Sequence, residues 1–355
     1  MVMESVEPGS PSLSASLMRM ITGFYPSRAI YLAADLGLAD LLAAGPRTAA
    51  DLAAATGTHT PSLTRVLGLL TSTGVLVQDA DGKFGLSPMG ELLRTDTPDS
   101  VHQIALLFAG PLQHQLWGEL EHSVRTGESA FERALGEPVF SYLSKHPEEA
   151  IVFDRAMTYF ATQIATGVVE AYDFSPFDTV VDVGGGQGML LRNVLRAYPG
   201  VNGILFDRPE VVDGVRAEIA ESDLADRCAV VGGSFFEEVP SGGEVYLLKS
   251  IIHDWDDEHS AEILGNCRRV MPENGRLLLI DQVVPDRVGL SAEDEMITGS
   301  DLNMMVTIGG RERTEGELRT LLANSGFELN KIVPLGGLER GIHGVCSVIE
   351  CMRAA

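Results

Sequence analysis

A glycine-rich segment next to acidic residues is the part of this sequence best suited to hold a nucleotide-like ligand. Residues 179–188 read Thr-Val-Val-Asp-Val-Gly-Gly-Gly-Gln-Gly, and a helical pattern resumes at Met189. The valines are typical of a buried parallel strand, and the glycines allow a turn that brings the backbone close to a ligand. Strand, turn and helix start together predict a ligand site at the carboxyl edge of a parallel sheet.

The spacing of the glycines argues against a dinucleotide, because Met189 occupies the place of the third fingerprint glycine. Asp182 would repel a pyrophosphate but suits a cationic amino group. Asp207, after the second predicted strand, can accept hydrogen bonds from ribose hydroxyls. S-adenosylmethionine has a ribose and an amino group but no phosphate, so this cofactor fits a turn built around Gly184 and Gly186. The alternative is a purely structural glycine turn with surface acids.

A histidine follows the fourth predicted strand and therefore lies at the same sheet edge. His253 can act as a general base, because the ordinary pKa of histidine, about 6.5, suits that task. Asp281 lies near the end of the fifth predicted strand, and Glu312 lies in the loop before the next helix. Either carboxylate could orient the imidazole and stabilise its charged form. The alternative is a surface or capping histidine with two solvated acids.

The strength of a histidine base favours a phenol as the group that loses its proton. A phenol titrates near pH 10, so about one in 10³ molecules is ionised at neutral pH. General-base assistance contributes roughly 10²–10⁴, which matches that deficit. An aliphatic hydroxyl, with a pKa near that of water at about 16, would need far more help.

Composition excludes several classes of protein. The formal charge of −24 over 355 residues argues against a general nucleic-acid binder. No uninterrupted apolar run is long enough to span a membrane, and no secretory signal is apparent, so we expect a cytoplasmic protein without membrane contact. The four cysteines form no C-x-x-C pair and are interpreted as reduced core thiols, so no metal site is expected.

From residue 179 onward, strand and helix patterns alternate, which predicts an α/β, doubly wound, mostly parallel seven-stranded sheet. The predicted strands are Thr179–Val183, Gly203–Phe206, Cys228–Val231, Glu244–Lys249, Arg276–Val284, Glu328–Leu335 and His343–Glu350.

The N-terminal part predicts a small helical domain. Residues 1–12 are rich in Ser, Pro and Gly and are expected to be disordered, and a helical pattern covers residues 13–44. Two short helices, with Thr48 as N-cap of the first, and a hairpin at Asp81-Gly82 then form a winged-helix unit. Arg65 is the only Lys or Arg between residues 48 and 82, so the unit suits dimerisation better than DNA binding.

We predict a boundary between residues 105 and 106, with a helical dimerisation domain at 1–105 and a catalytic domain at 106–355. Within the latter, residues 106–175 form a helical segment and residues 176–355 the cofactor-binding core. Phe153 and Met157 repeat at helical spacing. They are either ordinary core residues or part of a pocket for a flat ligand.

Four motifs in order resemble the small-molecule O-methyltransferases, the plant caffeic acid type and their bacterial natural-product relatives. They are Asp-Val-Gly-Gly-Gly-Gln-Gly, Val-Gly-Gly-Ser-Phe-Phe-Glu-Glu-Val-Pro, Leu-Lys-Ser-Ile-Ile-His-Asp-Trp-Asp-Asp-Glu and Gly-Gly-Arg-Glu-Arg-Thr. The resemblance covers nearly the whole chain. It implies a class I methyltransferase fold, S-adenosylmethionine as cofactor with S-adenosylhomocysteine as product, no metal, and an intertwined homodimer.

The resemblance also implies roles for individual residues. His253 would be the base, flanked by Asp281 and Glu312. The cofactor would be held by Asp182, Gly184, Gly186, Asp207, Ser234, Phe235, Lys249 and Trp255. The acceptor would be lined by Phe153, Met157, Asp254, Asp301, Asn303 and Met304.

Two positions depart from the family pattern. Many relatives have Asp where this chain has Ser234, and plant relatives have Glu where this chain has Asp281. The sequence therefore predicts transfer of a methyl group to a phenolic hydroxyl of a small aromatic natural product. Two alternatives stay open, namely a non-methylating reaction such as hydroxylation or decarboxylation on the same fold and cofactor, and a winged-helix DNA-binding regulator.

Overall fold

The computed structural model describes residues 12–338 and 341–354, so the predicted disorder of residues 1–12 falls almost wholly outside the described residues. These residues form two compact units. The first comprises residues up to 115 together with Ile151–Ala156, and the second comprises Leu116–Ala150 and residues from Met157 onward. Each unit is described by itself.

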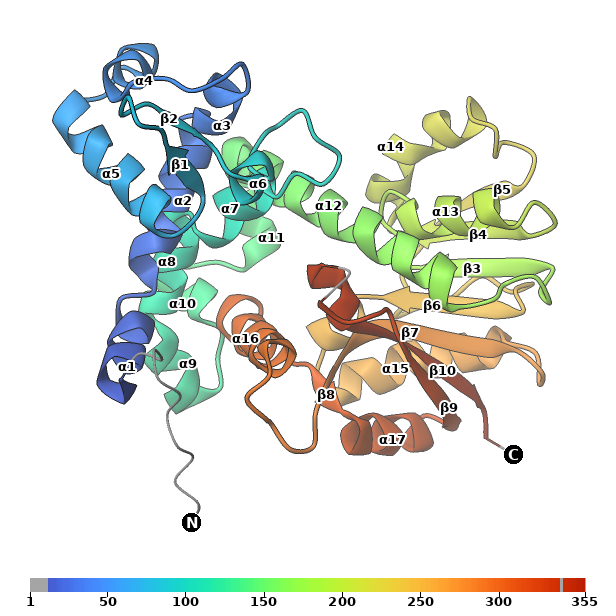
Figure 1. The fold of residues 1–355 in the computed structure, drawn as a ribbon. Coiled ribbons are helices and arrows are strands. Elements are labelled where there is room, and N and C mark those ends of the chain that lie inside the picture. The colour runs from blue at the N-terminus through green and yellow to red at the C-terminus, as the bar shows by residue number, and fades with distance from the viewer. Residues whose placement is uncertain (1–11, 339–340, 355) are drawn as a thin grey trace. The chain divides into compact units, whose positions relative to one another are not determined.

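The first unit is helical with one short hairpin, as the sequence predicts (Figure 1). Its elements are α1 (Leu13–Ile21), α2 (Phe24–Asp35), α3 (Leu38–Leu42), α4 (Ala49–Thr56), α5 (Thr60–Ser72), β1 (Leu76–Gln78), β2 (Phe84–Leu86), α6 (Pro88–Glu91), α7 (His102–Phe108) and the start of α8 (Pro111–Gly118). The helical pattern over residues 13–44 is divided into three helices, the last starting after Gly37 in the left-handed region. Thr48 caps α4 by accepting a hydrogen bond from the Asp51 N–H, as predicted.

The second unit begins with a helical segment that precedes the sheet. It contains the end of α8, then α9 (Leu120–Thr126), α10 (Ala130–Leu135), α11 (Val139–Lys145) and most of the long helix α12 (Pro147–Ala171). Within the described ranges no helix is both long and apolar enough to cross a membrane.

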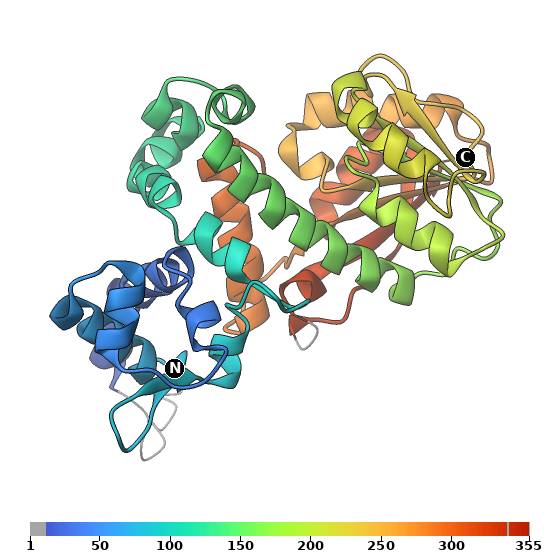
Figure 2. The ribbon, with the colours of Figure 1, turned by 90° about the horizontal axis from the view of Figure 1, so that it is seen from above.

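The rest of the second unit is a twisted sheet with helices on both faces (Figures 1 and 2). Its strands are β3 (Thr179–Val183), β4 (Asn202–Asp207), β5 (Cys228–Gly232), β6 (Val245–Lys249), β7 (Arg276–Val284), β9 (Phe327–Pro334) and β10 (Cys346–Arg353), in the spatial order β5-β4-β3-β6-β7-β10-β9. The pairs from β5 to β7 are parallel, and β10 is antiparallel to both β7 and β9. The predicted α/β class and seven-stranded order of elements are confirmed.

Four of the strands differ from the predicted bounds by one residue at one or both ends, and two differences are larger. The last strand starts at Cys346 rather than at residue 343, because Ile342–Val345 form a 3₁₀ turn. A two-residue strand, β8 (Arg313–Thr314), pairs with the end of β7 and was not predicted.

The sheet is buried between two apolar layers. Residues of α12, α13 (Met189–Ala197) and α14 (Pro209–Ala220) pack on one face, and residues of α15 (Asp257–Val270) and α17 (Glu315–Asn324) pack on the other. Cys346 belongs to the first layer and Cys351 to the second, so the two thiols face opposite sides of β10. Because β3, β4, β6 and β7 run parallel, their carboxyl ends share one edge, where the glycine turn follows β3, Asp207 ends β4 and His253 follows β6.

Candidate active site

The glycine turn after β3 is fixed to the end of β4. The N–H groups of Gly184 and Gly185 donate to the carbonyl of Phe206, at 2.8 and 3.2 Å. The N–H of Gly186 donates to Asp207 Oδ2 at 2.8 Å. Gly184 and Gly186 have φ angles of 70° and 57°, which favour glycine. The glycine turn and Asp207, which the sequence assigned to one ligand, are therefore joined by hydrogen bonds.

Asp182 lies beneath this turn and is 1 % exposed. A Cβ atom placed on Gly185 would lie 2.7 Å from the Asp182 Cγ, so the turn rests directly on the carboxyl group. Within the described part of the chain, neither carboxylate oxygen has a hydrogen-bond partner. Burial raises the pKa of Asp182 to about 6, against the opposing effect of Lys249.

An aromatic group borders the glycine turn. The Phe235 ring lies 3.5 Å from the place of a Cβ atom on Gly184. Phe235 and Phe236 pack edge-on to Trp255, with centroids 6.3 and 4.8 Å from the Trp255 ring centroid. Ser234 accepts the N–H of Phe236 on its hydroxyl at 3.3 Å. The second and third motifs thus meet the first one, and they offer an apolar aromatic wall suited to a flat base.

His253 lies on a 3₁₀ turn, η1 (Ile252–Asp254), just beyond β6. Its Nδ1 is 3.0 Å from Glu312 Oε1 and 3.7 Å from Asp281 Oδ1, while its Nε2 is 3.4 Å from Asp254 Oδ1. Burial lowers the pKa of His253, but Asp281, Glu312 and Asp254 outweigh burial and raise it to about 10. The structure therefore brings together the histidine and the two acids that the sequence singled out, and adds Asp254.

The Glu312 loop is held to the His253 turn along the main chain. Arg311 N–H donates to the carbonyl of His253 at 2.8 Å. A Cβ atom on Gly310 would lie 2.3 Å from that same carbonyl oxygen, so the close approach requires glycine. Asp301 Oδ1 accepts the N–H of Glu312 at 2.8 Å. Asp301 thus helps to fix the loop that carries Glu312.

Arg313 is a site residue that sequence analysis missed. Its buried guanidinium donates to the carbonyls of Ile252 and Trp255, both at 2.8 Å, and to Asp257 Oδ1 at 2.8 Å. These carbonyls stand on either side of His253 and Asp254, so Arg313 clamps the catalytic turn. A basic residue in a loop ordinarily indicates a solvated charge, and nothing local in the sequence distinguishes this one.

Ser250 is a second residue that the sequence did not single out. It lies between Lys249 and η1 and is the only non-glycine residue with positive φ in the described ranges, at 54°. Such a conformation costs free energy for a residue with a Cβ and clusters at functional sites. It redirects the chain from β6 into the turn that presents His253.

The predicted acceptor residues fall into separate groups. Asp301, Asn303 and Met304 all lie on α16 (Ala292–Thr307), and Asn303 Oδ1 accepts the Trp117 Nε1–H at 3.1 Å. Met157 lies on α12 within the second unit. Phe153 belongs to the first unit, so its part in an acceptor pocket stays a prediction.

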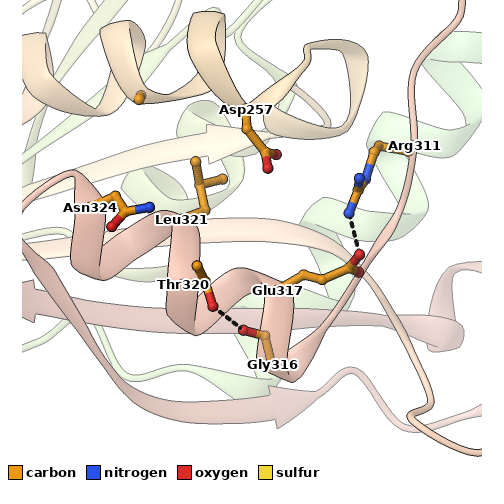
Figure 3. Close-up of a pocket in the computed structure, with 8 residues that line it drawn as sticks. Asp257, Arg311, Gly316, Glu317, Thr320, Leu321 and Asn324 are labelled. Carbon is orange, nitrogen blue, oxygen red and sulfur yellow. Dashed lines mark hydrogen bonds and ion pairs between the residues drawn. The ribbon is translucent and has the colours of Figure 1, made fainter.

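A surface pocket between α15 and α17 lies apart from these residues (Figure 3). It has a volume of about 340 Å³ and is lined by Asp257, Ala261, Arg311, Gly316, Glu317, Thr320, Leu321 and Asn324. Two of these residues, Arg311 and Glu317, form an ion pair, and both side chains are exposed. None of the predicted site residues lines it. Among residues 12–338 and 341–354, no cluster of three His, Cys, Asp or Glu side chains could hold a metal.

Comparison with known proteins confirms the resemblance that the four motifs indicated. A family model described as an O-methyltransferase domain matches residues 117–328, and one described as an O-methyltransferase dimerisation domain matches residues 18–96. The second match favours assembly over DNA binding for the winged-helix unit.

Individual relatives agree with these matches. The chain is 45 % identical to a phenazine O-methyltransferase of Lysobacter antibioticus, over 93 % of this chain and 96 % of the relative. It is 40 % identical to the O-demethylpuromycin-O-methyltransferase of Streptomyces alboniger, over 91 % and 86 %. A solved O-methyltransferase from neocarzinostatin biosynthesis, in complex with S-adenosylmethionine and 2-hydroxy-5-methyl naphthoic acid, superposes with a TM-score of 0.78 at 31 % identity over 95 % and 98 %. This chain is therefore an enzyme that belongs to the O-methyltransferase family.

Proposed function

We propose that this enzyme transfers the methyl group of S-adenosylmethionine to a phenolic hydroxyl of a small aromatic natural product, leaving S-adenosylhomocysteine. The observation that supports this most is the position of His253 at the same sheet edge as the glycine turn, with Glu312 Oε1 at 3.0 Å from its Nδ1. Nε2, which has Asp254 Oδ1 at 3.4 Å, is then the nitrogen that would take the proton of the acceptor hydroxyl. A histidine base and a phenol match in strength, as the magnitudes above indicate.

The residues around the glycine turn fit the cofactor. Asp207, held beside Gly186, offers carboxylate oxygens for ribose hydroxyls, and Phe235 and Trp255 offer an apolar wall for adenine. The turn covers Asp182. Its carboxylate would therefore attract a cationic amino group through its charge, without direct contact. When bound, S-adenosylmethionine supplies a methyl group activated by a sulfonium. Orientation of that methyl group toward the acceptor oxygen can contribute about 7–11 kcal/mol.

Lys249 and Ser234 complete the proposed cofactor contacts. Lys249 ends β6 beside the turn, where its charge lowers the pKa of Asp182 against the larger effect of burial. Ser234 starts the segment that places Phe235 against Gly184. With a serine in place of the acid of many relatives, the adenine contact is expected to depend on the main chain and the hydroxyl.

On the acceptor side we propose roles for α16 and α12. Asn303, bonded to Trp117, and Met304 would shape the pocket, together with Met157. The relatives named above act on a phenazine and on O-demethylpuromycin, and the naphthoic acid in the solved complex is likewise aromatic. An acceptor with fused or substituted aromatic rings is therefore the class we expect here.

We also propose that two copies associate through the first unit. Its match to a dimerisation domain supports this. The apolar side chains of α1 and the start of α2 are exposed in the single chain, including Leu13, Met20, Ile21 and Phe24. Burial of such a patch against a second copy would be favourable. Light scattering of the purified protein would give twice the mass of the chain, and the mass of a monomer would refute this part.

Incubation with S-adenosylmethionine and a panel of phenolic acids, catechols and polyketide phenols tests the proposed reaction. Mass spectrometry would find an acceptor that gains one methylene together with S-adenosylhomocysteine. Consumption of an acceptor without that gain would instead support hydroxylation or decarboxylation. A mobility-shift assay at low salt is expected to show no DNA binding, because the winged-helix unit has few cations.

A further inference from the structure

The imidazole of His253 faces carboxylates at both of its ring nitrogens. Glu312 and Asp281 stand at Nδ1, at 3.0 and 3.7 Å, and Asp254 stands at Nε2, at 3.4 Å. The His253 side chain is 17 % exposed, that of Glu312 only 1 %, and that of Asp254 31 %. Buried acids therefore lie at Nδ1 of the histidine, and a partly exposed acid lies at Nε2.

This arrangement determines the proton content of the resting histidine. A neutral imidazole has one N–H donor and one lone pair, and a lone pair directed at a carboxylate oxygen is repelled. When the acids at both nitrogens are ionised, only the doubly protonated ring can donate to each of them. The raised pKa of His253, near 10, has the same cause. A resting imidazolium has no free nitrogen and cannot by itself accept the proton of a phenol.

We propose that Asp254 is the proton acceptor that completes the base, an inference that rests on the proposed methyl transfer. Asp254 takes the Nε2 proton of the imidazolium, and Nε2 then takes the proton of the phenolic hydroxyl. The phenolic oxygen forms its bond to the methyl group as the methyl–sulfur bond breaks and leaves its electron pair on sulfur. Asp254 finally releases its proton to water, so one proton leaves for each methyl group transferred.

Asp254 is better placed for this task than the other acids. Glu312 and Asp281 both stand at Nδ1 and are buried, so a proton passed to them has no direct way to solvent. Asp254 stands at the nitrogen that faces the acceptor and is the most exposed of the three. Burial raises the pKa of Asp254 and outweighs the opposing charge of His253, so the carboxyl is closer to accepting a proton.

The charged groups around the pair come from several elements. Glu312 lies before β8, Asp281 on β7 and Lys249 at the end of β6. Asp301 approaches from α16 and is tied to the N–H of Glu312. The Cys346 thiol on β10 is protonated, because burial raises its pKa to about 12. The positive charge of Lys249 lowers the pKa of Asp254 and of Asp281. The acids together stabilise the imidazolium, and Asp254 is the one that can pass a proton to solvent.

The competing possibility is that Asp254 only positions the acceptor through a hydrogen bond. Both roles predict lower activity for Asp254→Asn, so a loss of activity alone does not separate them. They differ in two respects. A proton outlet is needed only if the resting His253 carries a proton on both ring nitrogens, whereas positioning serves a neutral ring equally well. An outlet also matters less for an acceptor that arrives already ionised.

Nitrogen NMR of histidine-labelled protein at about pH 7.5 tests the first difference without turnover. The His253 signals are assigned by their loss in His253→Gln. In the wild type both ring nitrogens should carry protons, and in Asp254→Asn the pKa of His253 should fall measurably. An unprotonated Nε2 in the wild type, or an unchanged pKa in Asp254→Asn, would overturn the proposal.

Methylation of 4-substituted catechols tests the second difference. For Asp254→Asn the loss in kcat should be at least about tenfold larger with 4-methylcatechol than with the more acidic 4-nitrocatechol. An equal loss across the series indicates positioning only and contradicts the proposal. Asp256→Asn is the matched control, because Asp256 caps α15 from an exposed position and Asn caps equally well. If the wild type methylates none of a broad phenol panel, the proposed function fails, and the NMR result alone then decides the protonation claim.

Discussion

The buried acids of the second unit have two kinds of surroundings. Glu350 is fully hydrogen-bonded, whereas Asp182, Asp281 and Glu312 are not. Glu350 on β10 accepts the Tyr172 hydroxyl at 2.5 Å on one oxygen and the Asn330 amide on the other, with Lys331 at 3.6 Å. Asp182, Asp281 and Glu312 each keep at least one buried oxygen without a hydrogen-bond partner among the described residues.

The pKa values follow the same division. Burial raises the pKa of Glu350, but Tyr172, Asn330 and Lys331 outweigh it and leave the pKa below its usual value. Burial dominates at Asp182 and Asp281, whose pKa values are raised. Satisfied acids stabilise a fold, whereas incompletely satisfied ones store electrostatic free energy that a ligand or a proton can use. The comparison therefore distinguishes an acid that stabilises the sheet from acids of the same sheet that are available for binding or catalysis.

The largest expected effect is a loss of activity at the site that contains the incompletely hydrogen-bonded acids. His253→Ala should lower kcat by roughly 10²–10⁴, because general-base assistance is removed. Binding of S-adenosylhomocysteine, measured by calorimetry, should stay nearly unchanged, since the glycine turn and Asp207 do not depend on the imidazole. Turnover retained in this variant would remove His253 from the proposed chemistry.

Arg313→Met should come next, because it affects both stability and activity. Loss of the guanidinium leaves the carbonyls of Ile252 and Trp255 without their partner, which should cost about 3 kcal/mol in urea unfolding. The loosened turn should also lower kcat about tenfold or more. Arg311→Met, which breaks only a surface ion pair, is the control and should change stability by less than about 1 kcal/mol.

Glu350→Gln should reverse the pattern of His253→Ala. The change weakens the bonds from Tyr172 and Asn330 and should cost about 2 kcal/mol of unfolding free energy. Methyl transfer measured well below the unfolding temperature should stay within about twofold of wild type. Glu328→Gln, at an exposed site on β9, serves for comparison. A large fall in activity without a fall in stability would contradict the division between the two groups.

The smallest effect concerns pH. The pKa of Asp182 is raised in the folded protein to about 6, so between its ordinary value and 6 the folded state binds more protons than the unfolded state. Stability from this group is full below the ordinary pKa and is lost as pH rises through 6, at a slope of at most about 1.4 kcal/mol per pH unit. Asp182→Asn removes that slope. Parallel stability curves for the two proteins from about pH 4 to 7 would show that burial does not raise this pKa.

Much of the candidate site could be predicted from the sequence, because the ends of the parallel strands determine which residues lie at the same edge of the sheet. The bounds of β3 and β7 agree with the prediction, since apolar residues fill most of both strands and only a few polar residues, among them Asp182 and Asp281, stand between them. Glu312, at 3.0 Å, is closer to His253 than Asp281 is, at 3.7 Å, in line with the shorter acid at position 281.

What could not be predicted depends on contacts between distant segments. The start of β10 is displaced because Gly344 packs on the main chain of Gly337, which donates its N–H to the Gly344 carbonyl at 2.9 Å. Arg313 and Asp301 act on the site through main-chain atoms of other segments, so their residue types give no local signal. Only the folded chain shows which loop charges are buried.

The positive φ of Ser250 restricts how this sequence can vary over evolution. Glycine, asparagine and aspartate tolerate that conformation, whereas valine, isoleucine and threonine do not. The position separates a structural strand from the catalytic turn, so a substitution there that the backbone rejects would alter the presentation of His253 while leaving the sheet intact. Drift at position 250 should therefore be confined to small or left-handed-tolerant residues, however freely neighbouring surface positions change.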